Sequence, residues 1–391
     1  MKVLQVHNRY RFRGGEDAVF ENTLRLLKAH GMEACSFERS SQDMAGGLPR
    51  KVQAVFSGIY SPAAARDMAA CLAAERPDVV HVHNLFPLLS PSVLTACRKA
   101  GIPVVMTCHN FRLICPIGVH FRQGKVCEEC RGGREHRCIL NNCRDSRFES
   151  AAYGMRNLLT RKLGLFKNNV TRFIAISEFL KGRLTEAGYA EDRIDVVYNT
   201  IALPETGVDA AQGAYAAFTG RLSEEKGIET LLAAAAALPD VPVKIGGVGP
   251  IEDKLKAMAP ANVEFVGMLD KPGLAGLYRN ARCLIVPSVW FETFGLVAAE
   301  AMAHGVPVIA SRMGALPELV RDGETGFLFE AGNAEDLSVK IRTLWNDAAL
   351  ATRMGGAGRA RAGQEFDELT HFRRLAAVYE KAIATHRNGI A

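Results

Sequence analysis

Short apolar runs alternate along the chain with longer stretches in which apolar residues recur every three or four positions. Residues 3–7, 79–82 and 104–107 are runs typical of buried strands. Residues 17–30 have the spacing of an amphipathic helix. Because strand-like and helix-like segments keep alternating in this way, the pattern predicts an α/β fold with parallel sheets.

A change in composition divides the chain. Residues 201–212 are rich in Pro, Gly, Asp and Ala, and strand-like segments lie on either side of them, at 194–198 and 214–218. The length of 391 residues is enough for about two domains. We therefore predict one domain over residues 1–200 and a second over residues 201–366, followed by a terminal helix.

Residues 287–307 combine the features of an anion site. A short apolar strand leads into a loop that ends at Glu292, and residues 294–303 have the small, apolar character of a buried helix. The free N–H groups at the start of such a helix attract phosphate. They would belong to Phe294, Gly295 and Leu296. Glu300 lies further along the helix, so two carboxylates bracket the candidate site.

This stretch resembles the signature of the retaining family-4 glycosyltransferases, in which two glutamates flank an FGL turn. Residues 218–227 (FTGRLSEEKG) resemble the diphosphate-binding segment of the same family, and residues 307–329 continue the family pattern. The resemblance implies the GT-B fold, in which two Rossmann-like domains with parallel sheets face each other across a cleft. It further implies that the second domain binds a nucleotide diphosphate sugar, that the first binds the acceptor, and that residues 367–391 return to the first domain.

The resemblance gives roles to the charged residues of the second domain. Arg221 and Lys226 would stabilise the departing diphosphate, since guanidinium and ammonium groups suit phosphate oxygens. Glu300 would hold the ribose hydroxyls, and Glu292 with the FGL amides would hold the donor sugar. The chain has no Asp-x-Asp sequence to clamp a divalent cation on the diphosphate, so we expect no catalytic metal ion.

In the first domain, the candidate residues follow strand-like runs or precede a helix. His109 lies where the family places a histidine that contacts the donor sugar, and it comes at the carboxyl end of a strand, where ligands collect. His83 follows another strand and could be structural or could face the acceptor. Gly14 and Gly15 form a loop that in the family lies against the donor's phosphates, although glycine could equally serve only the turn.

Six of the ten cysteines lie within residues 108–143. Four thiolates at such spacing suit a tetrahedral zinc ion, and a cytosolic location disfavours disulfides. The favoured ligand set is Cys115, Cys127, Cys130 and Cys138, with Cys143 or His136 as alternatives. Because the insertion at about residues 115–143 has few apolar side chains to form a core, we expect such a zinc ion to be structural.

Net charge is +6, and the positive charge is concentrated in the first 200 residues. Residues 144–167 carry apolar side chains at helical spacing, with Arg and Lys on the other faces. Such a helix could lie on an anionic membrane surface or pack on its own sheet. The first alternative would suit an enzyme with a lipid-linked acceptor, as enzymes resembling this one often have.

No apolar run reaches the ~20 residues that cross a bilayer, and the N-terminus lacks the apolar core of a signal peptide. We therefore predict a cytoplasmic protein, peripheral on the inner face of the plasma membrane if it meets a membrane. The predicted reaction moves a hexose from a nucleotide diphosphate sugar, with uridine the preferred base, to a saccharide or lipid-linked acceptor in cell-surface polysaccharide synthesis.

Two other functions remain open at this point. A nucleotide-sugar epimerase can share the GT-B fold. A zinc-containing nucleic-acid-binding protein would account for the cysteines and the basic half of the chain. The second alternative leaves Glu292, Glu300 and the Arg221–Lys226 segment unexplained, and we expect no nucleic acid as a partner.

Overall fold

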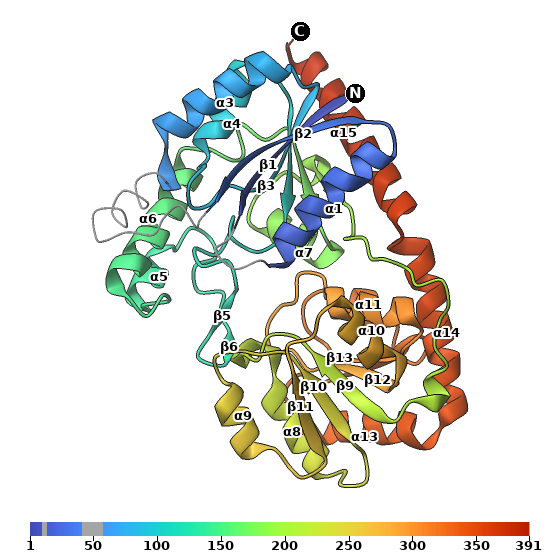
Figure 1. Cartoon of the computed structure of the whole chain (residues 1–391). Helices are drawn as coiled ribbons and strands as arrows, with labels where there is room; N and C mark the ends of the chain where they lie inside the picture. Colours follow the sequence, from blue (N-terminus) through green and yellow to red (C-terminus); the bar gives the residue numbers. More distant parts are fainter. Residues whose placement is uncertain (10–13, 41–57, 391) are drawn as a thin grey trace. The chain divides into compact units, whose positions relative to one another are not determined.

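The computed structural model describes residues 1–9, 14–40 and 58–390 (Figure 1). The chain forms two compact units, each made of more than one segment. The first unit consists of Met1–Val119, Glu128–Val197 and Phe372–Ala391. The second consists of His120–Cys127 and Tyr198–His371.

The first unit is built on a six-stranded parallel sheet with the order β2-β1-β3-β4-β7-β8. Its strands are β1 (Lys2–Arg9), β2 (Glu33–Ser40), β3 (Val79–Asn84), β4 (Val104–Cys108), β7 (Arg172–Ala175) and β8 (Ile194–Val196). Its helices are α1 (Gly15–Ala29), α3 (Pro62–Glu75), α4 (Ser92–Lys99), α5 (His136–Leu140), α6 (Arg147–Lys162), α7 (Glu178–Glu186) and most of α15 (Glu368–Ile390), with a 3-10 turn at Glu191–Arg193.

The C-terminal helix α15 completes the core of this unit. Val3, Val79 and Val105 of adjacent strands are fully buried, and they pack in one cluster with Val378 and Tyr379 of α15. Burying such side chains stabilises the unit by roughly 1.5–3 kcal/mol each. The last residues of the chain therefore belong to the same core as the first strand (Figure 1).

The second unit repeats the architecture with the strand order β11-β10-β9-β12-β13-β14, again parallel. Its strands are β9 (Tyr215–Thr219), β10 (Val243–Gly246), β11 (Val263–Gly267), β12 (Ala281–Val286), β13 (Val308–Ser311) and β14 (Gly326–Phe329), with a hairpin of β5 (Phe121–Arg122) and β6 (Lys125–Val126). Its helices are α8 (Ile228–Ala236), α9 (Glu252–Met258), α10 (Lys271–Arg279), α11 (Leu296–His304), α12 (Leu316–Leu319), α13 (Ala334–Asn346) and α14 (Ala348–Glu365), with 3-10 turns at Ala210–Gln212 and Glu224–Lys226.

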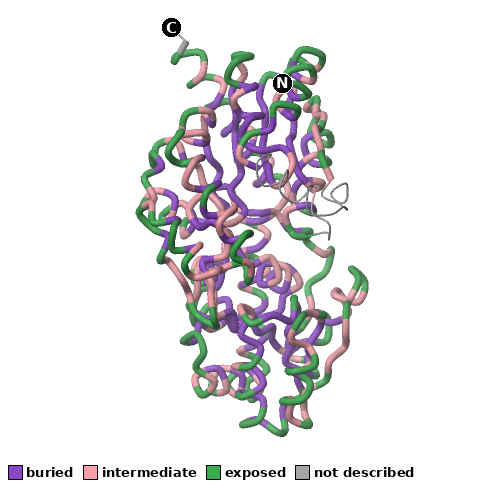
Figure 2. The backbone as a smooth tube through the Cα atoms, turned by 90° about the vertical axis from the view of Figure 1, so that its left-hand side faces the viewer, coloured by how far each residue is buried: buried purple, intermediate pink, exposed green. Residues whose placement is uncertain are grey.

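Two parallel six-stranded sheets with helical crossovers confirm the predicted α/β, Rossmann-like class. The buried residues gather in the interior of each unit (Figure 2). In the second unit the alanine-rich helix α8 packs on the sheet through Ile228, Leu231 and Leu232. Within the described ranges, no helix combines the length and the apolar character needed to cross a membrane.

Each sheet contains one point where the strand order reverses. In the first sheet the chain passes from β1 to β2 on one side and then to β3 on the other. In the second sheet β9, β10 and β11 run outward in one direction, and β12 then returns to the opposite side of β9. Ligands of open α/β sheets bind beyond the carboxyl ends of the strands at such a reversal. The two reversals are therefore the expected places for functional residues.

Candidate functional site

Two loops meet at the strand reversal of the second unit. The loop after β9 carries Arg221 and the short turn that ends at Lys226, and the loop after β12 begins at Pro287. They touch at Gly227, whose φ is +65°, and a Cβ atom there would lie 2.0 Å from the carbonyl oxygen of Pro287. Only glycine fits this approach. The close packing of the two loops fixes the backbone position of Lys226, which directly precedes Gly227.

Lys226 and Glu292 form an ion pair between these loops. The Lys226 Nζ donates to Glu292 Oε1 at 2.7 Å, and the Ser288 hydroxyl donates to the same oxygen at 2.6 Å. Burial by itself raises the pKa of Glu292, but the Lys226 ammonium and the two hydrogen bonds outweigh burial and lower that pKa overall. Glu292 is therefore an ionised, buried carboxylate, and it holds the ammonium of Lys226 in one place.

The segment after β13 packs against the backbone of Glu292. The Ala315 N–H donates to the Glu292 carbonyl oxygen at 2.8 Å. Gly314 has a φ of +61°, and a Cβ atom there would lie 2.2 Å from that carbonyl oxygen. The Ser311 hydroxyl donates to the Ser288 carbonyl oxygen at 2.6 Å. The sequence analysis missed Ser288, Ser311 and Gly314 as supports of Glu292, although the last two lie in the stretch that continues the family pattern.

Helix α11 begins two residues later than the sequence pattern predicted. Its N-cap is Gly295, in the left-handed region with a φ of +101°, and the first helical residue is Leu296. Phe294 lies outside the helix because its ring is buried beside Phe366, with 5.6 Å between the ring centroids. Since the Ala298 N–H already donates to the Gly295 carbonyl, the amides without an intrahelical partner at the helix start are those of Gly295, Leu296 and Val297. Gly295 and Leu296 were among the predicted amides.

Glu300 lies on α11 as predicted, and the Tyr278 hydroxyl donates to its Oε2 at 3.1 Å. Burial raises the pKa of Glu300, and the hydrogen bond from Tyr278 opposes that rise. Arg221, by contrast, is exposed, and its guanidinium pairs with no carboxylate in the described part of the chain. The second unit thus carries a cation tethered by Glu292, an exposed cation in the loop after β9, and a half-buried carboxylate on α11.

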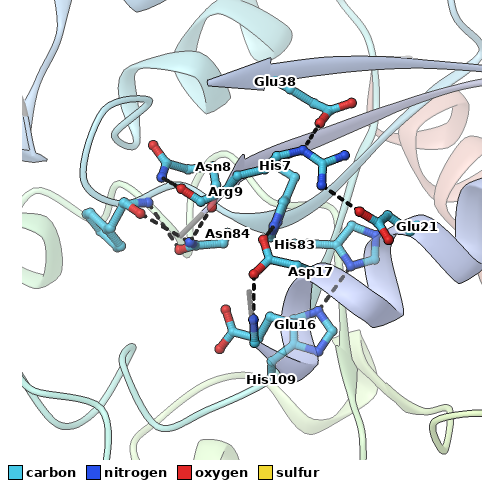
Figure 3. A network of polar contacts seen from close by, with 12 residues as sticks. His7, Asn8, Arg9, Glu16, Asp17, Glu21, Glu38, His83, Asn84 and His109 are labelled. Atoms are coloured by element: carbon cyan, nitrogen blue, oxygen red, sulfur yellow. Dashed lines mark hydrogen bonds and ion pairs between the residues drawn. The ribbon is translucent and has the colours of Figure 1, made fainter. Parts of the chain in front are cut away.

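The strand reversal of the first unit is lined by imidazoles (Figure 3). His83 lies near the end of β3, and His109 directly follows β4. His83 Nδ1 and His109 Nε2 are 3.0 Å apart, and the two rings are within 14° of parallel. Burial lowers the pKa of His109 to about 4, while Glu16 acts in the opposite direction. His109 is therefore a neutral imidazole at neutral pH.

Gly14 and Gly15 lie at the N-terminus of α1, next to the same cluster. Asp17 accepts the Gly14 N–H at 2.9 Å through Oδ2 and bonds His7 Nε2 at 2.8 Å through Oδ1. Glu16 adds a second carboxylate to the first turn of the helix. These carboxylates already occupy the positive end of the helix dipole, so the structure offers a phosphate less attraction here than the glycine loop alone suggested.

The zinc site predicted at Cys115, Cys127, Cys130 and Cys138 is not supported. Across residues 1–9, 14–40 and 58–390, no three histidine, cysteine or acidic side chains stand close enough together to hold a metal ion. Cys127 follows strand β6, where its N–H donates to the His120 carbonyl oxygen, and it belongs to the second unit. The Cys138 thiol instead donates to the Ser150 carbonyl oxygen at 3.8 Å, and burial raises the pKa of that thiol. The C-x2-C spacing was therefore a misleading signal.

Helix α6 differs from an ordinary surface helix because it buries mainly polar side chains and exposes apolar ones. Its buried residues are mostly polar: Ser150, Gly154, Arg156, Asn157 and Thr160. Arg156 donates to the Pro116 carbonyl oxygen at 2.8 Å, and Asn157 donates to the Arg112 carbonyl oxygen at 2.9 Å. Apolar side chains at its surface and next to it are exposed instead: Leu140, Phe148, Met155 and Leu163. Phe148 and Met155 lie on α6 itself, Leu163 is its C-cap residue, and Leu140 ends α5.

Two family models match the chain in succession. Residues 14–203 match the model described as "Glycosyltransferase Family 4". Residues 208–361 match the model described as "Glycosyl transferases group 1". Together they reach from the loop before α1 into α14, and they include His83, His109, Lys226 and Glu292.

Curated relatives agree with these matches. A glycogen synthase of Mycobacterium tuberculosis is 34% identical over 78% of this chain and 69% of that protein's length. A sulfoquinovosyl transferase of Arabidopsis thaliana is 36% identical over 36% of this chain, and that alignment spans 28% of the plant protein's length.

Solved structures share the fold over nearly the whole chain. A sucrose-phosphate synthase from Thermosynechococcus elongatus has a TM-score of 0.72 and 21% identity, and 98% of this chain and 99% of that chain are covered. The Anabaena protein Alr3699/HepE, solved in complex with UDP-glucose, has a TM-score of 0.65 and 20% identity, with coverage of 97% and 100%. At these identities the likeness shows the GT-B fold.

Proposed function

Because the chain belongs to glycosyltransferase family 4, whose members are retaining enzymes that need no metal ion, we propose that it moves a hexose from a uridine diphosphate sugar to a saccharide or lipid-linked acceptor. We further propose that the product belongs to cell-surface polysaccharide synthesis. The observation that carries the proposal is the ion pair between Lys226 and the buried Glu292, four residues before the start of α11. Family membership favours transfer over epimerisation or nucleic-acid binding.

The leaving diphosphate meets the positive charge of the second unit in this proposal. The Lys226 ammonium, held by Glu292, and the Arg221 guanidinium bind the diphosphate oxygens. The free amides of Leu296 and Val297 add the positive end of a helix dipole. Since the Lys226 ammonium and the helix amides are in place before reaction, they stabilise negative charge as it develops on the departing phosphate without reorganising.

The sugar itself is transferred with retention. The bond from the anomeric carbon to the phosphate oxygen breaks, and the bond to the acceptor oxygen forms on the same face of the sugar. The acceptor's proton passes to the phosphate oxygen, so the products are the glycoside and the nucleoside diphosphate. Glu292 does not act as a nucleophile in this scheme, because its Oε1 is already occupied by Lys226 and Ser288.

Glu300 and His109 bind the rest of the donor. Glu300 accepts hydrogen bonds from the ribose hydroxyls, and Tyr278 keeps its carboxylate oriented. His109, a neutral imidazole, contacts a hydroxyl of the donor sugar. The Gly14–Gly15 loop approaches the phosphates through backbone atoms only. HepE, a protein of the same fold, was solved in complex with UDP-glucose, and this supports our choice of uridine as the base.

A panel of nucleotide sugars tests this proposal. Thermal stabilisation would be measured with UDP-, GDP- and ADP-linked sugars, and stabilisation by a UDP-sugar alone is expected. Product analysis then follows with and without a saccharide or lipid-linked acceptor. Stabilisation by none of the nucleotides would contradict donor binding, and a new nucleotide sugar formed without any acceptor would show epimerisation instead.

The surface of α6 supports a peripheral membrane contact in addition. Phe148 is 50% exposed, Met155 46% and Leu163 60%. Arg147 and Lys162, at the two ends of the helix, form no ion pair with any described residue. Exposed apolar side chains flanked by uncommitted cations suit an anionic bilayer. We therefore place α6 on the membrane from which a lipid-linked acceptor would be taken.

Vesicle sedimentation tests the membrane contact. Wild-type protein is expected to bind vesicles that contain phosphatidylglycerol and to leave vesicles of phosphatidylcholine alone. Phe148→Ser should weaken binding about tenfold, because one buried aromatic side chain contributes roughly 1.5–3 kcal/mol. Met268→Ser, which removes a 73% exposed apolar side chain of the second unit, is the matched control. Equal binding by both variants would reject α6 as the contact.

A further inference from the structure

The ring of His83 is enclosed on several sides. Phe20 packs against it edge-on, with 5.5 Å between ring centroids, and His81 lies at 4.2 Å. His109 forms the hydrogen-bonded third neighbour, 3.0 Å from nitrogen to nitrogen. His83 is only 4% exposed. A ring enclosed in this way has one orientation, because the alternatives would clash with close-packed neighbours.

His81, the neighbour of His83, is itself fixed at both ring nitrogens. Its Nε2 is 2.7 Å from the Thr107 hydroxyl, and its Nδ1 is 2.8 Å from the hydroxyl of Tyr379. Tyr379 lies on α15 and is fully buried, so a residue 298 positions later in the chain closes the network. A hydrogen bond between buried groups in a low dielectric holds its partners firmly.

His109 has one committed and one uncommitted nitrogen. Its Nε2 bonds His83, while its Nδ1 is buried and makes no hydrogen bond with any described residue. An unsatisfied buried polar atom destabilises the folded state. A ligand hydroxyl that bonds Nδ1 would recover that free energy. The hydrogen bond at Nε2 also couples the tautomer of His109 to that of His83. If His83 Nδ1 donates, His109 Nε2 accepts and Nδ1 of His109 carries the proton; if His83 Nδ1 accepts, Nδ1 of His109 offers a lone pair.

We propose that His83 is a positioning residue for His109, and that Tyr379 supports it through His81. Tyr379 of α15, His81, His83 and His109 form one series of contacts that ends beyond β4, and each side chain restricts the orientation of the next. We call this series the relay. His83 selects a single tautomer of His109 and directs its Nδ1 toward one hydroxyl of the donor sugar. The proposal deepens the function proposed above and rests on it for the identity of the ligand at Nδ1.

Variants of His83 separate positioning from packing. His83→Leu removes the hydrogen bond and retains apolar volume, whereas His83→Asn keeps a polar atom near the place of Nδ1. In ¹⁵N NMR of histidine-labelled protein, His109 should show one tautomer in the wild type, a mixture in His83→Leu, and one tautomer again in His83→Asn. Transferase kcat/KM for the donor should fall ten- to a hundredfold in His83→Leu and recover most of that loss in His83→Asn.

Tyr379→Phe tests the far end of the relay with the smallest change available. It removes only the hydroxyl that bonds His81, and kcat/KM for the donor should fall a few-fold. Tyr215→Phe is the matched control: its buried hydroxyl donates to the Leu277 carbonyl oxygen at 3.0 Å in the second unit. The control should lose a similar amount of thermal stability and keep wild-type kcat/KM.

The two possible failures are distinguishable. A single, unchanged tautomer of His109 in His83→Leu would overturn the positioning role, whatever the activity. Wild-type turnover in His109→Ala would instead overturn the proposed contact between His109 and the donor sugar, and the NMR readout would still decide whether His83 orients His109.

Discussion

The two strand reversals of this protein lie between β1 and β3 in one six-stranded parallel sheet and between β9 and β12 in the other, and they carry different side chains. In the second unit an ammonium and a carboxylate meet at 2.7 Å, and both are charged. In the first unit the groups at the strand ends are imidazoles, and His109 is neutral because burial lowers its pKa to about 4. The strand reversal of the second unit therefore carries a pair of opposite charges, whereas that of the first unit carries a neutral imidazole suited to a directed hydrogen bond.

The difference matches what each part of a nucleotide sugar requires. A diphosphate carries negative charge that grows as the sugar departs, and fixed cations are the means of stabilising that charge. Sugar hydroxyls carry no charge, and a neutral imidazole can accept or donate one directed hydrogen bond to them. In the proposed contact, a protonated His109 would add a positive charge where an uncharged sugar hydroxyl requires only a directed hydrogen bond.

Removing the tethered cation should have the largest effect. We expect Lys226→Ala to lower kcat by about 10²–10³-fold, since the loss of one group that stabilises developing charge has that size. The variant should stay folded, as judged by circular dichroism, although burial will raise the pKa of Glu292 once its ammonium partner is gone. Activity would be measured at saturating donor.

Lys244→Ala is the control for that change. Lys244 also belongs to the second unit and pairs with a carboxylate, Glu264, at 3.0 Å, but Glu264 is 61% exposed. An exposed pair contributes at most about 1 kcal/mol, and turnover should be unchanged. Similar turnover in the two variants would remove the distinction between a charged and an uncharged strand reversal.

Glu300→Gln should have an intermediate effect, confined to donor binding. The amide can still accept a hydrogen bond from Tyr278, but it is a weaker acceptor for two ribose hydroxyls than a carboxylate is. We expect the donor KM to rise about tenfold, which corresponds to a loss of about 1.4 kcal/mol of donor binding free energy. We expect kcat to change little. Titration with the nucleoside diphosphate by calorimetry measures the same loss without turnover. A large fall in kcat with unchanged KM would place Glu300 in catalysis instead.

The pH dependence of donor binding should show the smallest of the three effects. Burial raises the pKa of Glu300 above its ordinary value, so as pH falls the carboxylate takes up a proton earlier than an exposed glutamate would. Tyr278→Phe removes a hydrogen bond that opposes this rise. The acid limb of donor affinity should therefore move to higher pH in the variant, with little change at alkaline pH.

The same shift has a consequence for stability. Because the folded-state pKa of Glu300 lies above its unfolded value, its contribution to stability is present at low pH and is lost as pH rises through the folded-state pKa. Glu300→Gln should accordingly be no less stable than wild type at neutral pH.

The donor-affinity prediction for Tyr278→Phe can also fail. If donor affinity falls at the same acidic pH in Tyr278→Phe as in wild type, a group other than Glu300 controls that affinity.

The start of α11 shows how far sequence patterns reach. The order of a strand, a loop with Glu292 and a small-residue helix with Glu300 was correct. The first helical residue was wrong by two, because Phe294 is drawn into the core beside Phe366 and Gly295 takes a left-handed conformation. Whether an aromatic side chain points into a core depends on residues far away in the chain, and periodicity does not contain that information.

Helix α14 shows the opposite case, a whole element without a sequence signal. Its glycines disfavour a helix by about 1 kcal/mol each relative to alanine. The structure explains one of them: a Cβ atom on Gly355 would lie 2.0 Å from the carbonyl oxygen of Gly305, at the end of α11. Close approach of two helices outweighs the intrinsic preference, and that approach exists only in the folded unit.

The sequence by itself determined the α/β class, the family, and the residues that carry charge in the second unit, because alternating patterns and short motifs are local. Only the tertiary structure decided that Lys226 pairs with Glu292, that His83 holds His109, that the cysteines form no metal cluster among the described residues, and that α6 exposes apolar side chains. Each of these depends on distances between segments tens of residues apart, which are fixed by how the strands are ordered in the sheets.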